Sequence, residues 1–194
     1  MPKMPNGDAV FEQGRGGGYW IWKPYIVKKK FDEINDGDIL VYADAGCTIN
    51  PKGSKRFQDY IKMTANKEVI AFQLARQKCK KWTTKEIYQY FDVLPEDKNQ
   101  IIATLFFLKK GEFSKGIVDL WYNTAQLNPI LFTDEFNDLQ QNKYFKDNRH
   151  DQSIFSVILR KMTCNKLEIL WDETHRKTRK NEFEFPFSAD RKKS

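Results

Sequence analysis

The feature that most constrains this chain is a glycine-rich loop followed by a helix, a tight turn and a short apolar strand that ends in a carboxylate. The loop and the start of the helix lie in Arg15–Tyr25 (RGGGYWIWKPY), and the strand lies in Asp38–Gly46 (DILVYADAG). Open α/β sheets place ligand-binding groups where strands end. We therefore expect an α/β domain with ligand chemistry near Asp44. The alternative is that Asp44 only begins a surface turn, and the spacing leaves both interpretations open.

The rest of the chain also alternates helical and strand-like patterns. Pro24 suits the first turn of a helix, where its missing N–H costs nothing. Ile39–Ala43 is almost fully apolar, which is typical of a central strand covered on both faces. Further helices are expected at about 54–66, from a Thr83 cap to Phe91, after a Ser114 cap and from Ile154, and further strands at 69–74, 101–108 and 167–171.

The chain is expected to form one domain. Its 194 residues are enough for one core, and we find no internal repeat or dividing linker. Residues 1–14 are polar and are expected to be poorly ordered, which leaves 15–194 as the domain. Residues 128–148 are predicted to form a long loop of a length that is often functional. The aromatic tail, Phe183–Phe187, is expected to dock on the body.

The net charge indicates which partners to expect, and the cysteine content indicates the cellular compartment. The chain has 33 Lys and Arg against 26 Asp and Glu, a net charge of +7, which favours anionic partners such as nucleotides, phosphates, nucleic acid or anionic lipid. There is no apolar run long enough for a transmembrane segment and no signal-peptide core. The three scattered cysteines form no CxxC pair, which indicates free thiols. We expect a cytoplasmic protein, or one in the host-cell cytoplasm if viral.

Two polar groups are candidates for the chemistry. Asp44 offers the oxygen ligand that Mg²⁺ or Mn²⁺ prefers, but Gly46 stands where a second carboxylate would complete an Asp-x-Asp pair. Arg149–Ser153 (RHDQS) precedes an amphipathic helix, whose N-terminal amides favour anions. The alternative is that Asp151 or Ser153 only caps this helix and that His150 is exposed.

The aromatic residues near the N-terminus and a histidine near the C-terminus can each be interpreted as structural or as functional residues. The aromatic side chains could bury area in the core or stack on a nucleobase or sugar ring; they are Tyr19, Trp20, Trp22 and Tyr25. His175 lies among charged residues, where it binds a diphosphate or is simply solvated. The chain has no Walker loop, GxSxG or HExxH motif, which argues against those enzyme classes.

Together the motifs resemble a group of bacterial and viral glycosyltransferase-like proteins of the GT-A class. The segments that carry the resemblance are GYWIWKP, GDILVYADAGC and RHDQSIFS, and it runs from about Arg15 to the FPFSADR ending. The resemblance implies a single-domain, Rossmann-like open twisted sheet flanked by helices. It implies an enzyme that moves a sugar from a UDP- or GDP-sugar to a hydroxyl of a glycan, lipid-linked or protein acceptor. Mn²⁺ or Mg²⁺ is the implied cofactor.

The resemblance also assigns roles to individual residues. Asp44 stands where the class has its metal-binding Asp-x-Asp, and His150 and His175 are alternatives for a later metal or diphosphate ligand. Asp151 and Gln152 resemble the Asp-Gln pair that contacts the donor sugar, so they are the implied catalytic residues. The implied nucleotide- and substrate-binding residues are Arg15, Tyr19, Trp22, Lys23, Asp44 and Arg149.

The chain departs from the class in one further respect, and two rival functions stay open. The class begins with a βαβ portion that binds the base, whereas only fourteen residues precede this glycine loop. The chain is naturally short, a fragment, or a member that lacks the N-terminal strands and has a reduced nucleotide pocket. One rival is a catalytically silent protein that binds a nucleotide sugar or glycan. The other is a basic nucleic-acid-binding protein, which we disfavour because the charge is spread over many segments and no such motif is present.

Overall fold

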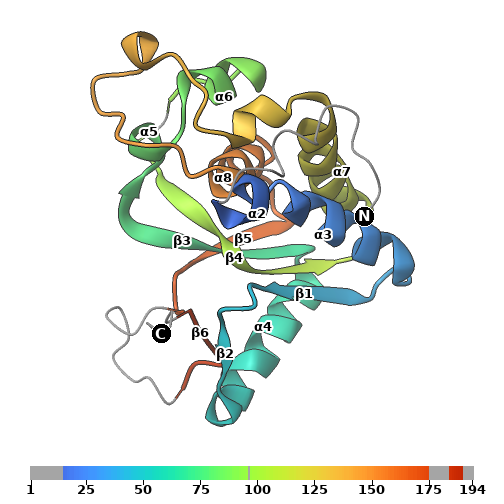
Figure 1. Cartoon of the computed structure of the whole chain (residues 1–194). Coiled ribbons are helices and arrows are strands. Elements are labelled where there is room, and N and C mark those ends of the chain that lie inside the picture. Colours follow the sequence, from blue (N-terminus) through green and yellow to red (C-terminus); the bar gives the residue numbers. More distant parts are fainter. Residues whose placement is uncertain (1–14, 96, 175–183, 190–194) are drawn as a thin grey trace.

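The protein has an α/β fold in which a mixed open sheet is flanked by helices (Figure 1). This computed structural model describes residues 15–95, 97–174 and 184–189. The four-stranded sheet consists of β1 (Ile39–Ala43), β3 (Val69–Lys78), β4 (Asn99–Lys109) and β5 (Leu167–Trp171), and a separate pair is formed by β2 (Thr48–Ile49) and β6 (Phe187–Ser188).

Strand direction decides where a ligand can bind. The order in the sheet is β1-β4-β3-β5, with β4 antiparallel to both of its neighbours and β5 parallel to β3. Consequently β1, β3 and β5 run in one direction and only β4 runs against them. The carboxyl ends of these three strands therefore meet at one edge of the sheet, where open α/β folds place their ligands.

Helices cover both faces of this sheet. Figure 1 shows α3, α7 and α8 on one face and α4 on the other. The helices are α2 (Gly16–Tyr19), α3 (Trp22–Glu33), α4 (Ser54–Asn66), α5 (Cys79–Trp82), α6 (Lys85–Tyr90), α7 (Glu112–Leu127) and α8 (Asp151–Lys161), with 3₁₀ turns η1 (Pro51–Gly53), η2 (Pro129–Phe132) and η3 (Asp138–Gln140). Within the described ranges, none of these helices combines the length and apolar character needed to span a bilayer.

The two faces of the sheet carry two separate apolar cores. Phe106 and Leu108 of β4 belong to the larger core, which the helices of the first face complete with residues such as Trp121. Phe107, the residue between them, belongs to the smaller core, with Tyr60 of α4. Because successive side chains point to opposite faces and both faces are covered, the run 101–108 within the strand is apolar except at Thr104.

The expectation that Ile39–Ala43 is a central strand was wrong. The run forms β1, which pairs only with β4 within the described sheet and lies at its edge. It is nevertheless covered on both faces, since Leu40 and Tyr42 pack on the larger core and Val41 packs on the smaller one. An all-apolar pattern indicates that both faces of a strand are covered. It does not indicate whether the strand has one or two neighbouring strands in the sheet.

Two helix caps differ from the expected residues. Thr84, one residue after the expected Thr83, is the cap of α6, and its hydroxyl accepts a hydrogen bond from the N–H of Ile87. Ser114 lies inside α7, which begins after Gly111, and its hydroxyl accepts a hydrogen bond from the N–H of Gly111. The first departure is a shift of one residue between adjacent threonines, which cap equally well. The second is larger, because the cap position of α7, Gly111, lies three residues before the cap expected at Ser114.

The long loop and the tail follow the expectation in part. The 128–148 segment is not free of structure, because it contains η2 and η3. The tail docks through Phe187, which is buried in the smaller core. Asn50 binds this segment twice, by donating its backbone N–H to Pro186 and its side-chain amide to Phe185. Phe183 and residues 1–14 lie outside the described residues.

Replacing Gly53 with Ala is expected to lower the free energy of unfolding by about 1–3 kcal/mol, the usual cost of overpacking. A Cβ at Gly53 would meet the backbone of Phe185 and Pro186 at 2.3–2.5 Å, so the docked tail would have to move. Urea denaturation measures the effect. Gly46→Ala is the control because its Cβ would meet nothing within 4 Å. Equal stability of the two variants would contradict this packing.

Candidate functional site

A cavity of about 970 Å³ lies at the carboxyl ends of the three strands that run together. Asp44–Cys47 follow β1, Gln77 lies late in β3, and Asp172 follows β5. The remaining lining residues come from the glycine loop, β3, β4, α5, the start of α8 and the tail: Trp20, Trp22, Leu74, Ala75, Trp82, Gln100, Ile102, Thr104, Arg149, Gln152 and Ala189. Segments distant in the sequence therefore converge on one concave site, as expected for a ligand pocket.

The glycine loop brings two tryptophans to this cavity. Gly16, Gly17 and Gly18 all have positive φ, which glycine adopts at no steric cost. A Cβ at Gly16 would lie 2.5 Å from the Trp20 ring, so only glycine lets that indole pack here. The indole N–H of Trp22 donates a hydrogen bond to the carbonyl of Gly16 at 3.0 Å. The loop thus positions aromatic faces at the cavity, and no phosphate contact is needed to explain its glycines.

An irregularity in the sheet shapes the floor of the cavity. The pairing of β3 with β4 shifts register between Ala71 and Gln73. In this part of β4, the carbonyl of Thr104 accepts the N–H of Asp44 at 2.9 Å, and the carbonyl of Ala103 accepts the Lys23 ammonium at 3.2 Å. Bulges of this kind recur next to active sites, where they redirect backbone and side-chain groups.

A buried ammonium joins the two main sequence motifs. Lys23 Nζ lies 3.1 Å from Asp44 Oδ1 and 2.7 Å from Asp151 Oδ2. Lys23 is 2 % exposed and Asp151 is 5 % exposed, whereas the Asp44 side chain is 31 % exposed. Within the described residues, Asp151 Oδ2 accepts no aligned hydrogen bond, so its contact with Lys23 is an ion pair. One lysine therefore holds a buried carboxyl group and one that faces the cavity.

The charges of this cluster are coupled. Burial opposes the charged form of Lys23, but Asp151 and Asp44 outweigh it, so the pKa of Lys23 lies above its usual value. Burial raises the pKa of Asp151, although Lys23 opposes the shift. Burial and the neighbouring Asp44 carboxylate raise the pKa of Tyr42, whose hydroxyl donates to Asp44 Oδ1 at 2.8 Å. Lys23 is thus held as a cation between two competing carboxyl groups.

The described residues do not fit a metal held by the protein alone. Asp44 Oδ1 already receives the Lys23 ammonium and the Tyr42 hydroxyl, and the charge of Lys23 opposes a second cation. Within the described ranges, no group of three or more His, Cys, Asp or Glu side chains could hold a metal ion. Mn²⁺ or Mg²⁺ binding stays a prediction, because His175 lies outside the described residues.

Another part of the cavity lining combines an arginine stacked on a tryptophan ring with side-chain amides. The Arg149 guanidinium lies over the Trp82 ring, 4.1 Å from its centroid. The side-chain amide of Gln152 donates to Gln100 Oε1 at 2.6 Å, and Gln100 in turn donates to Ser153 Oγ. Both glutamines line the cavity. This wall offers an aromatic face, a cation and fixed amide groups, which together suit a polar ligand with an apolar ring face.

His150 is buried, which contradicts the alternative in which Asp151 or Ser153 caps the helix and His150 is exposed. It is 2 % exposed, occupies the cap position of α8 with φ 52°, and its Nδ1 lies 2.8 Å from the Phe132 carbonyl. Its ring contacts Tyr19 and Trp20, with centroids 5.0 and 5.5 Å away. Helix α8 begins at Asp151, so neither Asp151 nor Ser153 is its cap. The buried His150 ring therefore packs against the aromatic residues at the end of the glycine loop.

The stability of the protein is expected to fall as His150 becomes protonated. Burial lowers the pKa of His150, and the Phe132 carbonyl and Asp134 oppose this only in part. The unfolded chain therefore binds this proton at a higher pH than the folded protein does. The contribution of neutral His150 is fully present above about pH 6.5, the ordinary pKa, and is lost as the pH falls through the lower folded pKa.

Urea denaturation at about pH 7.5 and about pH 5.5 tests this sign. Wild type is expected to lose more free energy of unfolding between the two pH values than His150→Asn, in which the titrating ring is absent. Carboxyl groups titrate in both proteins, so the difference between them isolates His150. Parallel pH profiles would contradict the expectation.

The structure brings together only part of the expected site. Four of the expected residues line the cavity: Trp22, Asp44, Arg149 and Gln152. Lys23 and Asp151 lie beneath them as the ion cluster. Within the described residues, the cavity lining does not include Arg15, Tyr19 or His150. Arg15 instead pairs with Asp134 at 3.0 Å and Asp147 at 3.5 Å.

Sequence reasoning missed several residues of the cavity and of the Lys23 cluster. Gln100 is a fully buried amide, but in the sequence it ends a polar stretch just before the apolar run 101–108, so nothing there indicated its burial. Tyr42 lies two residues before Asp44, and the strand period of two places it on the same side. Trp82 and Asp172 carried no such signal, because only the fold brings α5 and the end of β5 to the cavity.

Comparisons with known proteins add no assignment. No protein-family model matches the chain, and neither a curated protein nor a solved structure matches it. The geometry of the cavity and of the Lys23 cluster is therefore the basis for a function.

Proposed function

We propose that the protein is a glycosyltransferase that moves a sugar from a nucleoside-diphosphate sugar to an acceptor hydroxyl. The observation that carries the proposal is the convergence of Asp44, Arg149 and Gln152 on one cavity at the carboxyl ends of β1, β3 and β5. These residues come from the two motifs that resemble GT-A-class proteins. The mixed open sheet flanked by helices is compatible with that class.

The cavity has the groups that a sugar and a phosphate require. Trp20, Trp22 and Trp82 offer flat apolar faces of the kind that pack on a sugar or base. Asp44 and Gln152 offer acceptors for hydroxyl groups, and Arg149 offers a cation for a phosphate oxygen. A volume of about 970 Å³ is enough for a nucleotide sugar, because ligand pockets commonly range up to about 1,000 Å³.

In this proposal the protein acts by positioning and by fixed charge. Lys23 holds Asp44 and Asp151 in place, so Asp44 faces the donor in one orientation. Arg149 stabilises negative charge that grows on the departing diphosphate, because a preorganised cation costs no reorganisation during the reaction. Asp151 is buried beneath the cavity and acts as a positioning residue. Gln152, at the surface of the cavity, contacts the donor directly.

A donor screen tests the proposal. The protein is incubated with UDP- and GDP-sugars, with and without Mn²⁺ or Mg²⁺, and the released nucleoside diphosphate is measured. Release from at least one donor is expected, and chelation with EDTA reports whether a divalent cation takes part. Absence of both release and a thermal shift with every donor would overturn the proposal.

The second candidate is a protein that binds a nucleotide sugar or glycan without turnover. It is favoured by one observation: the Lys23 ammonium already balances the charge of Asp44. Calorimetry separates the two candidates. Donor binding that is unchanged in Asp44→Ala, together with no turnover in wild type, would favour silent binding over catalysis.

A further inference from the structure

Outside the cavity, the fold gathers basic residues from three segments into one surface. The backbone carbonyl of Lys98 accepts the N–H of Cys79, which joins the start of β4 to α5. The carbonyl of Lys81 accepts the N–H of Lys146, which joins α5 to the loop before α8. We call this surface the basic face and define it as Arg76, Lys78, Lys80, Lys81, Lys98, Lys143, Lys146 and Arg149, with Asp97 and Asp147 between them.

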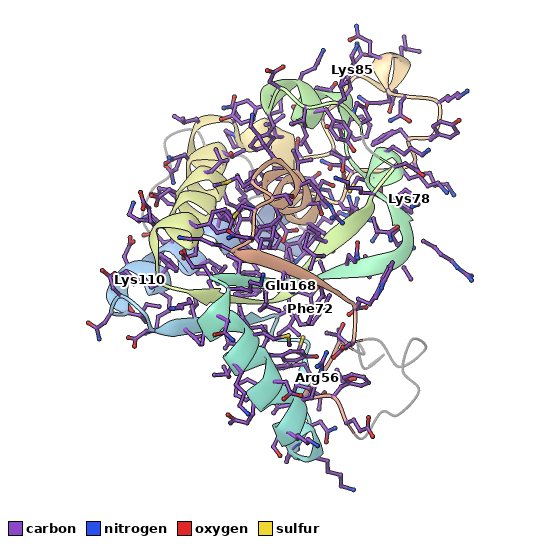
Figure 2. The ribbon with its side chains drawn as sticks, turned by 180° about the vertical axis from the view of Figure 1, so that it is seen from behind. Arg56, Phe72, Lys78, Lys85, Lys110 and Glu168 are labelled. Carbon is purple, nitrogen blue, oxygen red and sulfur yellow. The ribbon has the colours of Figure 1, made fainter. Side chains whose placement is uncertain are left out.

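The basic face carries a local excess of positive charge. Its eight basic and two acidic residues give it a charge of +6. The other 25 of the 33 Lys and Arg residues lie elsewhere in the chain, so the basic face is one concentration within a charge that is spread over many segments. In Figure 2, Lys78 of the basic face lies well away from Arg56 of α4. Such a concentration of one sign of charge attracts a polyanionic surface.

Apolar and aromatic side chains protrude beside the basic face. Leu139 is 96 % exposed and Leu94 is 84 % exposed, the two highest values among the exposed large hydrophobic residues. The groove next to them is lined by Leu94, by Gln140, the neighbour of Leu139, and by one basic and one acidic residue, Lys85 and Asp92. It is also lined by Asn142, whose amide donates to the carbonyl of Lys80. The leucines therefore border the basic face.

Tyr144 stands within the basic face itself. It is 48 % exposed, and the ammonium groups of Lys80 and Lys143 lie 4.4 and 5.1 Å from its ring centroid. Tyrosine is enriched where an apolar environment meets water, because its ring is apolar and its hydroxyl is polar. Lysines, a half-exposed tyrosine and protruding leucines form the combination that suits a lipid interface.

We propose that the basic face, together with Leu94 and Leu139, docks the protein on a bilayer that contains anionic lipids. The lysines meet the headgroups and the leucines enter the boundary between headgroups and acyl chains. A nucleic acid would use the same positive charge, but it offers no apolar layer for two nearly fully exposed leucines. Arg149 belongs to the basic face and also lines the cavity, so docking places the mouth of the cavity near the bilayer.

Vesicle flotation tests the proposal. The probe is phosphatidylcholine vesicles with and without about 30 % phosphatidylserine, a composition that gives a negative surface potential. Binding is expected only to the anionic vesicles and is expected to weaken as salt rises, since screening shortens the range of the attraction. Binding that is absent, or equal for both compositions, would overturn the proposal.

Two sets of variants locate the surface. Lys143→Glu with Lys146→Glu is expected to weaken vesicle binding at least thirtyfold, since each lysine contributes about 1 kcal/mol at such a surface. Lys55→Glu with Lys62→Glu, which makes the same charge change on exposed positions of α4, is the control and is expected to weaken binding far less. Equal losses in the two double variants would overturn the assignment to the basic face.

Variants of the two leucines distinguish binding to a membrane from binding to a nucleic acid. Leu94→Ser with Leu139→Ser is expected to weaken vesicle binding about tenfold or more and to leave the salt dependence unchanged, because it removes apolar burial without changing charge. Binding of single-stranded RNA is measured in parallel. RNA binding without vesicle binding, or vesicle binding insensitive to the two leucines, would overturn the proposal in favour of a purely electrostatic polyanion surface. None of these outcomes depends on whether the protein transfers sugars.

Discussion

Replacing Lys23 with Met is expected to lower the free energy of unfolding by about 3–5 kcal/mol, the usual cost of removing one partner of a buried ion pair. Met fills the space of the lysine stem but leaves the 5 %-exposed Asp151 without its counter-ion. The loss is expected to be smaller at low pH, because burial raises the pKa of Asp151 and a neutral carboxyl group needs no counter-ion. Urea denaturation at about pH 7.5 and about pH 4.5 measures both effects.

Lys28→Met is the matched control for this prediction. Lys28 lies on the same helix, α3, and pairs with Asp32 and Asp119, but these three side chains are more exposed to solvent than those of Lys23 and Asp151. Its replacement is expected to cost about 0–1 kcal/mol, as for exposed pairs. Adding Asp151→Asn to Lys23→Met is expected to restore part of the lost stability. Equal costs for the two single variants would show that the Lys23 cluster does not stabilise the fold.

Replacing Asp44 with Asn is expected to lower kcat/KM by about a hundredfold or more, a loss typical of removing one preorganised polar group from an active site. Asn keeps the shape of Asp44 and still accepts a hydrogen bond from Tyr42, while Lys23 keeps Asp151 as a partner. Stability should therefore change much less than activity. Steady-state assays with the donor found in the screen, together with thermal melting, separate the two effects.

Asp36→Asn is the control for Asp44. Asp36 is an exposed residue of the turn before β1, so its variant loses the same charge without touching the cavity. Its activity is expected to match that of wild type. If Asp44→Asn also kept wild-type kcat/KM, Asp44 would have no part in catalysis.

The local patterns predicted most of the regular elements. The apolar runs at 69–74, 101–108 and 167–171 lie within β3, β4 and β5, and the 54–66 pattern corresponds to α4. These predictions succeeded because apolar periodicity is a local property of the chain. The position of β1 at the sheet edge was missed, since apolar residues pack on both faces of this edge strand, although its residues are only partly buried.

The candidate site was predictable in its main residues and unpredictable in its arrangement. Asp44 and Arg149–Ser153 stood out by their chemistry, but nothing in their spacing showed that Lys23 lies between Asp44 and Asp151. Arg15 was expected to bind the nucleotide or substrate, yet it pairs with Asp134 and Asp147, because the loops bring these two carboxylates close to it.

The sequence by itself determined which segments form helices and strands, which faces are apolar and which polar residues follow strand ends. Only the tertiary structure decided that three strands run together, that their ends surround one cavity, and that the separate lysine segments form the basic face. The physical reason is the separation along the chain over which each kind of interaction acts. Periodicity and capping act between residues a few positions apart, whereas the pairing of Lys23 with Asp151 and the meeting of α5 with Lys146 depend on contacts between residues far apart in the chain.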